Sequence, residues 1–565
     1  MADDCTPDYP ILIDHGFRLA KSHTWTGQLD SSLGVVDIEI KLPPDYPQSL
    51  PEFYLISEGD WFTRLANIER SGKICWVETD DVIIDTSRPK DVLAEALGRV
   101  KGLLLREPAE QMSEIQRELV AYWEDKTTIK CFRSLLTANE RSRPIVARIH
   151  SQPATGVVFA DSDEQLEEWS KHLSYYDNRK INAYYLAINS AFPVPRITSR
   201  FKLVDFLEFV QEIAEAESAL AFETWLRSKG LPAFLIISVK NTDESPRTLL
   251  LAEMTTNYSR HGFSRGKVPT SIQVDRSMSD SVNRRSISRI DSEYVIQRSG
   301  GVLQFQNRSA VIIGCGSVGS HIVDFLASAG IGRIDLFDGE FLLPENIYRH
   351  ALGFSETHKF KVNGLAQRIG RALPHVNIVP HPEALRLDDQ TQVASITSAD
   401  LVIFATGNMQ FEIMASSALN ISGGVIHAWL EPLGIGGHVL GRPDVAKPGC
   451  LRCLFQPDET LGIRNVKSLV KPGINFKRTL AGCAGTFTPY GKTAAVRAAT
   501  EAADLAGKIL ANELQESLLI SWTGDLSFPS ALSDQLSTDA IKLGPFNRQS
   551  SRLEVLCNQC RLATV

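Results

Sequence analysis

The stretch that decides the fold is Ala310–Ile313 (AVII), followed directly by Gly314–Gly319 (GCGSVG). The first run is continuously apolar, which is typical of a buried strand. An amphipathic helical pattern follows over residues 318–329. A strand, a G-x-G-x-x-G turn and a helix in this order predict a nucleotide-binding turn. The glycines let the backbone approach phosphates, and the helix N-terminus offers unpaired N–H groups.

A second predicted strand, Arg333–Phe337, ends at an acid that can accept a hydrogen bond from a ribose hydroxyl. Strands and helices alternate through residues 295–565, which predicts a Rossmann-like domain with a mainly parallel sheet. This pattern alone fits a dehydrogenase as well as an ATP-binding enzyme. The predicted nucleotide contacts are Gly314, Gly316, Gly319 and Asp338.

Polar residues beyond the second strand separate these two alternatives. Asn346 and Arg349 follow it closely, and Lys361 comes shortly after. Attack of a carboxylate on the α-phosphate of ATP builds negative charge, which Arg and Lys stabilise. A hydride-transfer enzyme has no need of these cations there. The residues therefore favour activation of a carboxylate by ATP.

The order of these residues resembles the adenylation domain of the ubiquitin-activating and ThiF/MoeB family. The resemblance implies that ATP is the cofactor and that the domain pairs as a homodimer. In that family the partner subunit supplies an Arg from ahead of the first strand, and Arg289 and Arg298 are both candidates here. The residues that carry the resemblance, and that it assigns to ATP, are Asp338, Asn346, Arg349 and Lys361.

The magnesium ligand of that family is missing from its usual place. The family holds Mg²⁺ with an Asp in a Thr-Asp-Asn run after the fourth strand. Here the run is Thr406-Gly407-Asn408, so glycine stands where the ligand belongs. Binding of Mg²⁺ then needs another acid, or water molecules on the nucleotide. Asp400, just ahead of the same strand, is the substitute candidate.

Two C-x-x-C pairs, Cys450 with Cys453 and Cys557 with Cys560, are typical of metal ligands. Four thiolates make a closed tetrahedral zinc site without an open position, so we expect structural rather than catalytic Zn²⁺. The pairs are too far apart in the chain for their spacing alone to bring them together. The activating-enzyme family has a distant four-cysteine zinc site of this kind.

Cys483 is the first candidate nucleophile. It lies in the run AGCAGTFTPYG (residues 481–491), ahead of a predicted helix that begins near Thr493. The segment resembles the part of activating enzymes that carries the thioester cysteine. A nearby helix N-terminus lowers the pKa of a thiol and so increases the thiolate. The alternative is a small buried residue among glycines.

Cys75 is the second candidate nucleophile. Its run GKIC and the upstream Pro43–Pro47 resemble the core of ubiquitin-conjugating enzymes, and Asn67 precedes Cys75 at that family's spacing. The resemblance implies that Cys75 carries a thioester. An Asn amide there stabilises the oxyanion or orders the loop. The family's His and Pro are replaced by Leu65 and Ala66.

These patterns predict an α/β multidomain chain with four segments. Residues 1–135 form an α+β ubiquitin-conjugating-like domain, and residues 136–258 a mixed α/β middle domain of unknown role. Residues 259–294, rich in Ser and Arg, are predicted as a linker. Residues 295–565 form the Rossmann-like adenylation domain with the zinc site.

Composition narrows the class of protein further. The chain has 565 residues, too many for one core, with 43% hydrophobic and 22% charged residues. A net charge of −8 does not favour direct nucleic-acid binding. The N-terminus lacks a signal peptide pattern, and no apolar stretch is long enough for a membrane helix, so we expect a cytoplasmic protein. In that compartment nine cysteines indicate metal ligands, nucleophiles or core residues rather than a disulfide framework.

A conjugating-like domain ahead of an activating-like domain resembles bacterial fusions from cyclic-oligonucleotide anti-phage defence (CBASS). That resemblance implies a donor protein with a free C-terminal carboxylate, a cGAS/DncV-like nucleotidyltransferase. The carboxylate is adenylated, passes to Cys483, then to Cys75, and is joined to a target lysine. A flexible tether holds the two cysteines at an effective concentration of ~mM.

Three alternatives remain at this stage. A ThiF/MoeB-like adenylyltransferase for sulfur transfer uses the front domain only to dock its carrier. An inactive scaffold binds nucleotide and recruits a defence enzyme, which the missing Asp at Gly407 and the lost His-Pro pair favour. A dehydrogenase is the most distant alternative.

Overall fold

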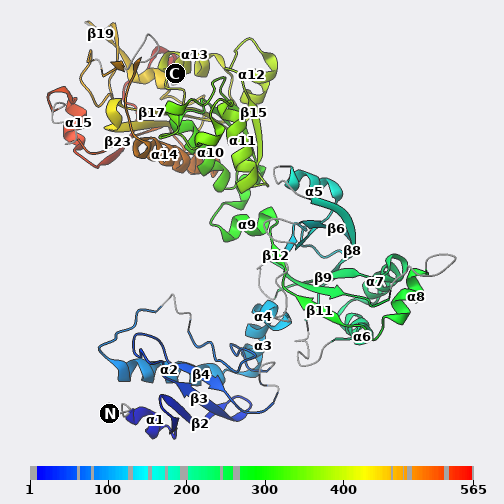
Figure 1. The fold of residues 1–565 in the computed structure, drawn as a ribbon. Helices are drawn as coiled ribbons and strands as arrows, with labels where there is room; N and C mark the ends of the chain where they lie inside the picture. The colour runs from blue at the N-terminus through cyan, green and yellow to red at the C-terminus, as the bar shows by residue number, and fades with distance from the viewer. Residues whose placement is uncertain are drawn as a thin grey trace. The chain divides into compact units, whose positions relative to one another are not determined.

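A computed structural model of the chain separates into two units, Met1–Leu166 with Tyr175–Ile290, and Glu167–Ser174 with Asp291–Val565. Each unit is described by itself (Figure 1). The structure describes residues 9–59, 61, 64–77, 82–124, 131–150, 156–171, 176–190, 192, 201–241, 246–258, 268–459, 462–474, 476–479, 486–526 and 533–562.

The first unit begins with an antiparallel sheet of four strands in the order β1-β2-β3-β4. Alternate residues of β3 are buried, among them Ile38 and Ile40, and they pack against the apolar face of helix α2. This α+β layer agrees with the fold expected for the N-terminal segment. Its elements are α1 (Pro10–Asp14), β1 (Arg18–Lys21), β2 (Thr24–Ser31), β3 (Gly34–Lys41), β4 (Glu52–Leu55) and α2 (Pro89–Leu104).

Two short helices, α3 (Pro108–Arg117) and α4 (Leu119–Trp123), lead out of this layer. Trp123 is fully buried, and its indole N–H donates a hydrogen bond of 2.8 Å to the carbonyl of Leu251 in the next sheet. A buried aromatic anchor of this kind fixes α4 against the second sheet of the same unit.

The second sheet has eight strands in the order β11-β10-β9-β8-β6-β7-β5-β12, and α6, α7 and α8 cover one face of it. It agrees with the mixed α/β middle domain expected from the sequence. Its elements are β5 (Cys131–Ser134), β6 (Arg143–His150), β7 (Gly156–Ala160), α5 (Asp163–Ser170), β8 (Tyr176–Ile188), α6 (Leu203–Ile213), α7 (Ala216–Lys229), β9 (Ala233–Val239), β10 (Thr248–Met254), α8 (Thr270–Arg276), β11 (Val282–Arg285) and β12 (Ser288–Arg289).

The segment expected as a linker (residues 259–294) differs from that expectation where the structure describes it. Residues 270–289 contribute α8, β11 and β12 to the second sheet. The Arg-rich composition is accommodated by pairing, since the buried Arg285 guanidinium lies 2.8 Å from the Glu253 carboxylate on the neighbouring strand. A paired charge can occupy a sheet where an unpaired one cannot.

The second unit is built on a sheet in the order β15-β14-β13-β16-β17-β18-β23-β24. The first four strand pairs are parallel and the last three antiparallel, which agrees with the Rossmann-like, mainly parallel domain expected from the sequence. The strands are β13 (Ser309–Ile313), β14 (Arg333–Phe337), β15 (Asn377–His381), β16 (Leu401–Phe404), β17 (Gly424–Leu430), β18 (Gly436–Arg442), β23 (Leu518–Thr523) and β24 (Arg548–Ser551).

Helices cover both faces of this sheet. α10, α11 and α14 pack on one face and lie together in Figure 1, while α12 and α13 pack on the other. The α-helices are α9 (Ser292–Arg298), α10 (Ser317–Ser328), α11 (Lys361–Ala372), α12 (Gln390–Thr397), α13 (Met409–Ala418), α14 (Lys492–Leu510), α15 (Thr538–Leu543) and α16 (Asn558–Leu562).

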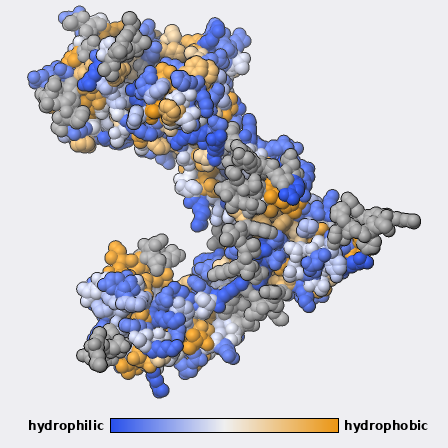
Figure 2. Space-filling model, viewed as in Figure 1, coloured by the Kyte–Doolittle hydropathy of each residue, from blue (hydrophilic) through white to orange (hydrophobic). Residues whose placement is uncertain are grey.

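Two small ribbons stand at the end of the sheet where the parallel strands finish. Strand β19 (Phe455–Asp458) pairs with β20 (Gly462–Asn465), and β21 (Arg478–Thr479) pairs with β22 (Thr486–Phe487). On the face seen in Figure 2, polar residues are interspersed with apolar ones. Among the described residues, no helix is both long and apolar enough to cross a membrane.

Candidate active site

The glycine turn connects the end of β13 to the start of α10, and each glycine has a distinct steric role. Gly314 has a positive φ of +92°, and a Cβ there would lie 2.8 Å from the backbone of Ala405. A Cβ on Gly319 would lie 1.9 Å from the carbonyl oxygen of Gly314. A Cβ on Gly316 would meet no atom within 4 Å, so this position leaves space that a phosphate group can occupy.

Asp338 lies at the end of β14, beside the glycine turn. Its two carboxylate oxygens accept hydrogen bonds of 2.8 Å from the backbone N–H groups of Cys315 and Glu340. Each carboxylate oxygen has a further lone pair, so the group can still accept a ribose hydroxyl. The Asp338 carboxylate thus fixes the glycine turn and keeps further capacity to accept a hydrogen bond.

The two cations expected from the sequence approach the same end of the sheet. Lys361 is the first residue of α11, and its buried ammonium group forms an ion pair with Glu340. The Arg349 guanidinium lies 4.9 Å from the ring centroid of Tyr490. The side-chain oxygen of Asn346 accepts a hydrogen bond from the backbone N–H of Leu343 and so shapes the turn that precedes Arg349.

Tyr490 is a site residue that sequence reasoning missed. Its hydroxyl lies 2.6 Å from the hydroxyl of Ser317, the first residue of α10, and its ring carries the Arg349 guanidinium. It therefore joins the segment that follows Cys483 to the phosphate end of the turn. The only signal was its place in the run around Cys483.

His350 is the second missed residue, although it directly follows Arg349. Its Nε2 lies 2.8 Å from the carbonyl of Cys315, and its Nδ1 accepts a hydrogen bond of 3.0 Å from the backbone of Leu352. Burial lowers the pKa of His350 to about 4. The imidazole is therefore neutral near pH 7, and it holds the Arg349 loop against the glycine turn.

Asp400 does not fit the role of substitute magnesium ligand. It precedes β16, whereas Gly314 and Gly407 follow the ends of β13 and β16. A strand rises about 3.3 Å per residue, so Asp400 lies at the end of β16 opposite to the glycine turn and Gly407. Its carboxylate is bound there by Arg308, at 2.9 Å.

Glu412 is the acid nearest in sequence to Gly407, and both of its oxygens are engaged. One accepts from the hydroxyl and backbone N–H of Thr406, and the other lies 2.9 Å from His427. Glu412 is fully buried. Within the described residues, this loop therefore offers no free carboxylate in place of the missing Asp.

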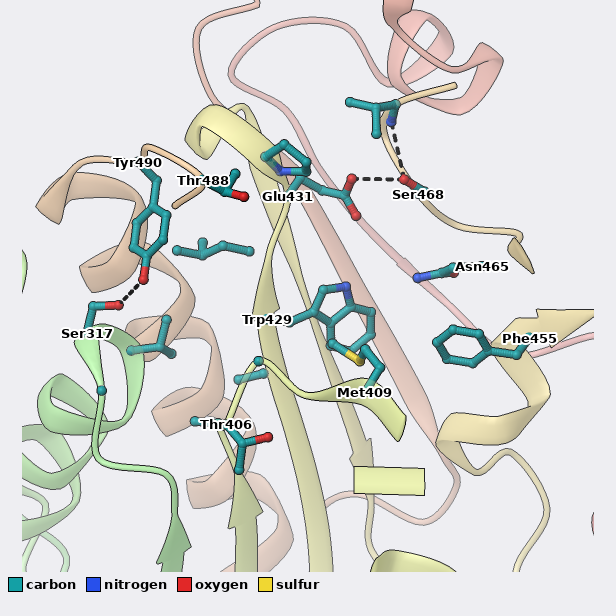
Figure 3. Close-up of a pocket in the computed structure, with 18 residues that line it drawn as sticks. Ser317, Thr406, Met409, Trp429, Glu431, Phe455, Asn465, Ser468, Thr488 and Tyr490 are labelled. Atoms are coloured by element: carbon teal, nitrogen blue, oxygen red, sulfur yellow. Dashed lines mark hydrogen bonds between the residues drawn. The ribbon is translucent and has the colours of Figure 1, made fainter. Parts of the chain in front are cut away.

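A cavity of about 480 Å³ opens beside the glycine turn (Figure 3). Gly316 and Gly407 are among its lining residues. In the view of Figure 3, Ser317 and Tyr490 lie on one side, Phe455 and Asn465 on the other, and Trp429 between them. A space of this size is typical of a ligand pocket, and its lining mixes apolar side chains such as Met409 and Phe455 with polar ones such as Thr406.

The four cysteines of the two C-x-x-C pairs come together. Their sulfur atoms all lie within 4.8 Å of one another, with 3.8 Å from Cys450 to Cys453 and 3.6 Å from Cys450 to Cys557. Metal–sulfur bonds of about 2.3 Å in a tetrahedron place the sulfurs about 3.8 Å apart. The cluster, completed by Cys560, thus fits Zn²⁺ in a closed site.

Cys483 lies outside the described residues. The described elements on either side of it are β21 and β22, which pair antiparallel with Thr479 opposite Thr486. The helix expected near Thr493 is α14, which begins at Lys492. The role assigned to Cys483 stays a prediction.

Cys75 is exposed, and acids surround it. Its thiol lies 3.8 Å from a carboxylate oxygen of Glu69. Partial burial of the sulfur raises the pKa of Cys75, and the charges of Glu69 and Glu118 raise it further. The thiol form therefore predominates at neutral pH, in contrast to a cysteine that is activated by a nearby cation.

Asn67 lies next to Cys75, as the sequence predicts. It has a positive φ of 60°, and its carbonyl accepts a hydrogen bond of 2.7 Å from the Cys75 backbone N–H. Arg106 donates to its side-chain oxygen at 3.3 Å. An Arg can only donate, so the amide nitrogen of Asn67 is the group left to donate toward an oxyanion.

Leu65 and Ala66, which replace the family's His and Pro, are buried. Gln111 of α3 accepts a hydrogen bond of 2.8 Å from the Ala66 backbone and donates one of 2.7 Å to the carbonyl of Leu103 in α2. The loop is therefore ordered by a glutamine from a later helix, which the local sequence pattern does not reveal.

The two candidate partner-chain arginines lie in different elements. Arg289 ends β12 of the first unit and donates to the carbonyl of Arg247 at 3.1 Å. Arg298 ends α9, the helix that precedes β13.

Comparison with known proteins defines the class. Residues 294–521 match the model of the ThiF family, and residues 18–132 match that of prokaryotic E2 family B. The chain is therefore a fusion of an E2-like domain with a ThiF-type, E1-like domain.

Two of the curated relatives match most of the chain, and a third matches about a third of it. The ATP-dependent ubiquitin transferase-like protein Cap2 of Pseudomonas aeruginosa is 25% identical over 488 residues, covering 82% of this chain and 81% of that protein. Cap2 of Escherichia coli is 19% identical, covering 82% and 84%. The adenylyltransferase and sulfurtransferase UBA4 of Vanderwaltozyma polyspora is 27% identical but covers 32% of this chain and 43% of that protein.

Solved structures show a weaker similarity to part of the chain. Escherichia coli MccB with ATP is 18% identical, covering 46% of this chain and 67% of that chain, with a TM-score of 0.32. PaaA is 16% identical, covering 44% and 65%, with a TM-score of 0.30.

Proposed function

We propose that this protein activates the C-terminal carboxylate of a donor protein with ATP and conjugates it to an amine on a target. The observation that carries the proposal is the arrangement at one end of the second unit's sheet. There the glycine turn, the cations of Arg349 and Lys361, and an open cavity adjoin one another. The match to both the ThiF and the E2 family models supports the same conclusion.

The first step forms an acyl-adenylate. A carboxylate oxygen of the donor attacks the α-phosphorus of ATP, and pyrophosphate leaves. The backbone N–H groups of the turn and the α10 N-terminus bind phosphate oxygens. Arg349 and Lys361 stabilise the developing negative charge. Mg²⁺ would accompany the nucleotide through its phosphates and water, because the described loop at Gly407 lacks a free acid.

The later steps pass the acyl group between sulfurs. The thiolate of Cys483 attacks the adenylate carbonyl and AMP leaves. The thiolate of Cys75 then attacks this thioester and releases Cys483. A target lysine amine finally attacks the Cys75 thioester, and Asn67 donates its amide N–H to the oxyanion.

The proposal extends to partners and setting. The donor is a cGAS/DncV-like nucleotidyltransferase of a CBASS defence system in a bacterial cytoplasm, and the ThiF-type domain pairs as a homodimer. Zn²⁺ in the four-cysteine cluster is structural. Relatives named ATP-dependent ubiquitin transferase-like support this class of activity.

The test is a trap in the native host. Cys75→Ser converts a labile thioester into a stable ester, and the protein is purified under denaturing conditions. Mass spectrometry then seeks a protein-sized adduct on the substituted serine and identifies the donor from its C-terminal peptide. Cys131→Ser, at the start of β5, is the matched control and carries no ester.

Each result of the trap has a definite meaning. An adduct that disappears in a Cys75→Ser, Cys483→Ala double variant supports the relay through both cysteines. An adduct that persists there means that Cys75 attacks the adenylate directly. Sulfide-dependent thiocarboxylate formation that is independent of Cys75 would instead favour the sulfur-transfer alternative, in line with the resemblance to UBA4.

A further inference from the structure

The cavity lies on one side of the glycine turn, and the ribose-binding acid lies on the other. Strand β13 has β14, which ends at Asp338, as one neighbour and β16 as the other. The cavity is lined from the β16 and β17 side, by Thr406 and Trp429 among others. A nucleotide held between the turn and Asp338 thus leaves the cavity open to a second substrate that meets the α-phosphate at Gly316.

The described lining of the cavity includes a neutral surface against which a side chain of the second substrate can pack. Met409, Trp429 and Phe455 present apolar surface, and no described lining residue is Lys, Arg or His. Glu431 is the one charged residue among those described in the lining. Its carboxylate already accepts hydrogen bonds from the Ser468 hydroxyl and the Leu469 backbone. The carboxylate under activation therefore stays with the cations at the turn, and the cavity suits the neutral residues before it.

Two hydrogen-bond donors point into this apolar space. Trp429 is only 6% exposed, and within the described part of the chain its indole N–H has no acceptor. Asn465 accepts from the Lys467 backbone at 2.9 Å through its side-chain oxygen, which leaves its amide N–H₂ directed toward Trp429 (Figure 3). N–H donors that face a cavity and have no acceptor among the described residues favour a ligand that brings carbonyl groups, as an extended peptide does.

We infer that this cavity receives the last residues of the carboxylate donor and selects a bulky apolar side chain among them. The inference rests on the proposed carboxylate activation and adds the chemistry of the tail. The Trp429 and Asn465 N–H groups pair with tail carbonyls, and the surface of Met409 and Phe455 covers the side chain. A tail ending in glycines fills none of this space. One added apolar group in such a pocket changes affinity by roughly tenfold or more.

The test uses short synthetic peptides with a free carboxylate and one common sequence. Each position near the carboxylate carries Gly, Leu or Phe in turn. The full-length protein is labelled with 5-fluorotryptophan, and Trp429→Phe assigns the Trp429 fluorine signal. Without ATP, we expect Leu or Phe at one position to shift that signal with at least tenfold tighter binding than Gly. Equal binding of all peptides, or no shift with any, would overturn the inference.

Variants locate the effect. Met409→Ala and Phe455→Ala reduce the preference for Leu or Phe, whereas Ile463→Ala leaves it unchanged. Ile463 is a matched control because it is exposed on β20, the strand that carries Asn465, but does not line the cavity. The fluorine signals of the other tryptophans report whether each variant is folded. An unchanged preference in folded Met409→Ala and Phe455→Ala variants contradicts the assignment.

A parallel measurement separates this inference from the proposed function. ATP–pyrophosphate exchange is followed with the same peptides. Exchange that is equally fast with Gly and with apolar tails supports carboxylate activation and overturns the selection of side chains. Selective binding at Trp429 without exchange by any peptide or full-length donor supports the cavity and contradicts the adenylation step.

Discussion

The two candidate reaction centres have opposite electrostatic surroundings. Near the glycine turn, Arg349 and Lys361 supply positive charge at the proposed adenylation site. At the E2-like centre, Cys75 faces the carboxylates of Glu69 and Glu118, which raise the pKa of its thiol. The first centre favours formation of an activated acyl group. The second keeps most of the Cys75 thiol protonated, so only a small thiolate fraction is available to attack a thioester.

The largest expected effect comes from removing a cation near the glycine turn. Arg349→Ala or Lys361→Ala removes a charge that stabilises the transition state, and we expect a loss of about 10²–10³-fold in ATP–pyrophosphate exchange. Exchange is measured with free donor protein, identified beforehand by the Cys75→Ser trap. Lys359→Ala, an exposed lysine two residues before Lys361, is the matched control. Full activity of both Arg349→Ala and Lys361→Ala would show that the cations are not part of the site.

The pH dependence of Cys75 alkylation tests the effect of the acidic surroundings of this thiol. Because its pKa is raised above the usual value for a thiol, the thiolate is the minor form at pH 7. Below that pKa, the thiolate fraction and the rate of alkylation rise about tenfold per pH unit. Iodoacetamide labelling of the Cys75 peptide, followed by mass spectrometry from pH 6 to 10, measures this slope. A plateau already at pH 7 would mean that the thiol is instead acidified.

Glu69→Gln sharpens the same comparison with a smaller effect. Loss of the carboxylate 3.8 Å from the thiol lowers the pKa of Cys75, and labelling at neutral pH rises. The pair is partly exposed, so we expect an increase of up to about fivefold. Glu110→Gln, an exposed acid in the first turn of α3, serves as control. A slower reaction in Glu69→Gln would instead make Glu69 the base that activates Cys75.

The smallest expected effect concerns Tyr490. Tyr490→Phe keeps the ring beneath Arg349 but removes the hydrogen bond to Ser317. One neutral hydrogen bond contributes about 1 kcal/mol, so we expect roughly a fivefold change in KM for ATP with an unchanged pH profile. Tyr348→Phe, at a residue that is 88% exposed, is the control. Equal KM values for both variants would remove Tyr490 from the nucleotide site.

The sequence predicted the parts of the site that depend on local pattern. The glycines and Asp338 lie within the consecutive elements β13, α10 and β14, where spacing alone determines which backbone groups meet. Tyr490 could not be found in this way, because its contact with Ser317 joins residues far apart in the chain. The role of Gln111 was hidden for the same reason.

The segment 259–294 was harder to predict, because its polar composition indicated a linker although its charged residues can be paired inside a sheet. Arg285 looked like part of a polar linker, yet its ion pair with Glu253 places it inside a sheet. The cavity was not predicted either, since β19, β20 and the residue after β16 approach one another only in the folded chain.

The four-cysteine cluster carries a consequence for the order of biosynthesis. Cys453 lies two residues before Phe455, the start of the ribbon that lines the cavity, whereas Cys557 and Cys560 are added about a hundred residues later. A tetrahedral metal site closes only when all four thiolates are available. A metal bound by all four thiolates would therefore join the start of this ribbon to α16, the last described helix, only after both pairs have been synthesised.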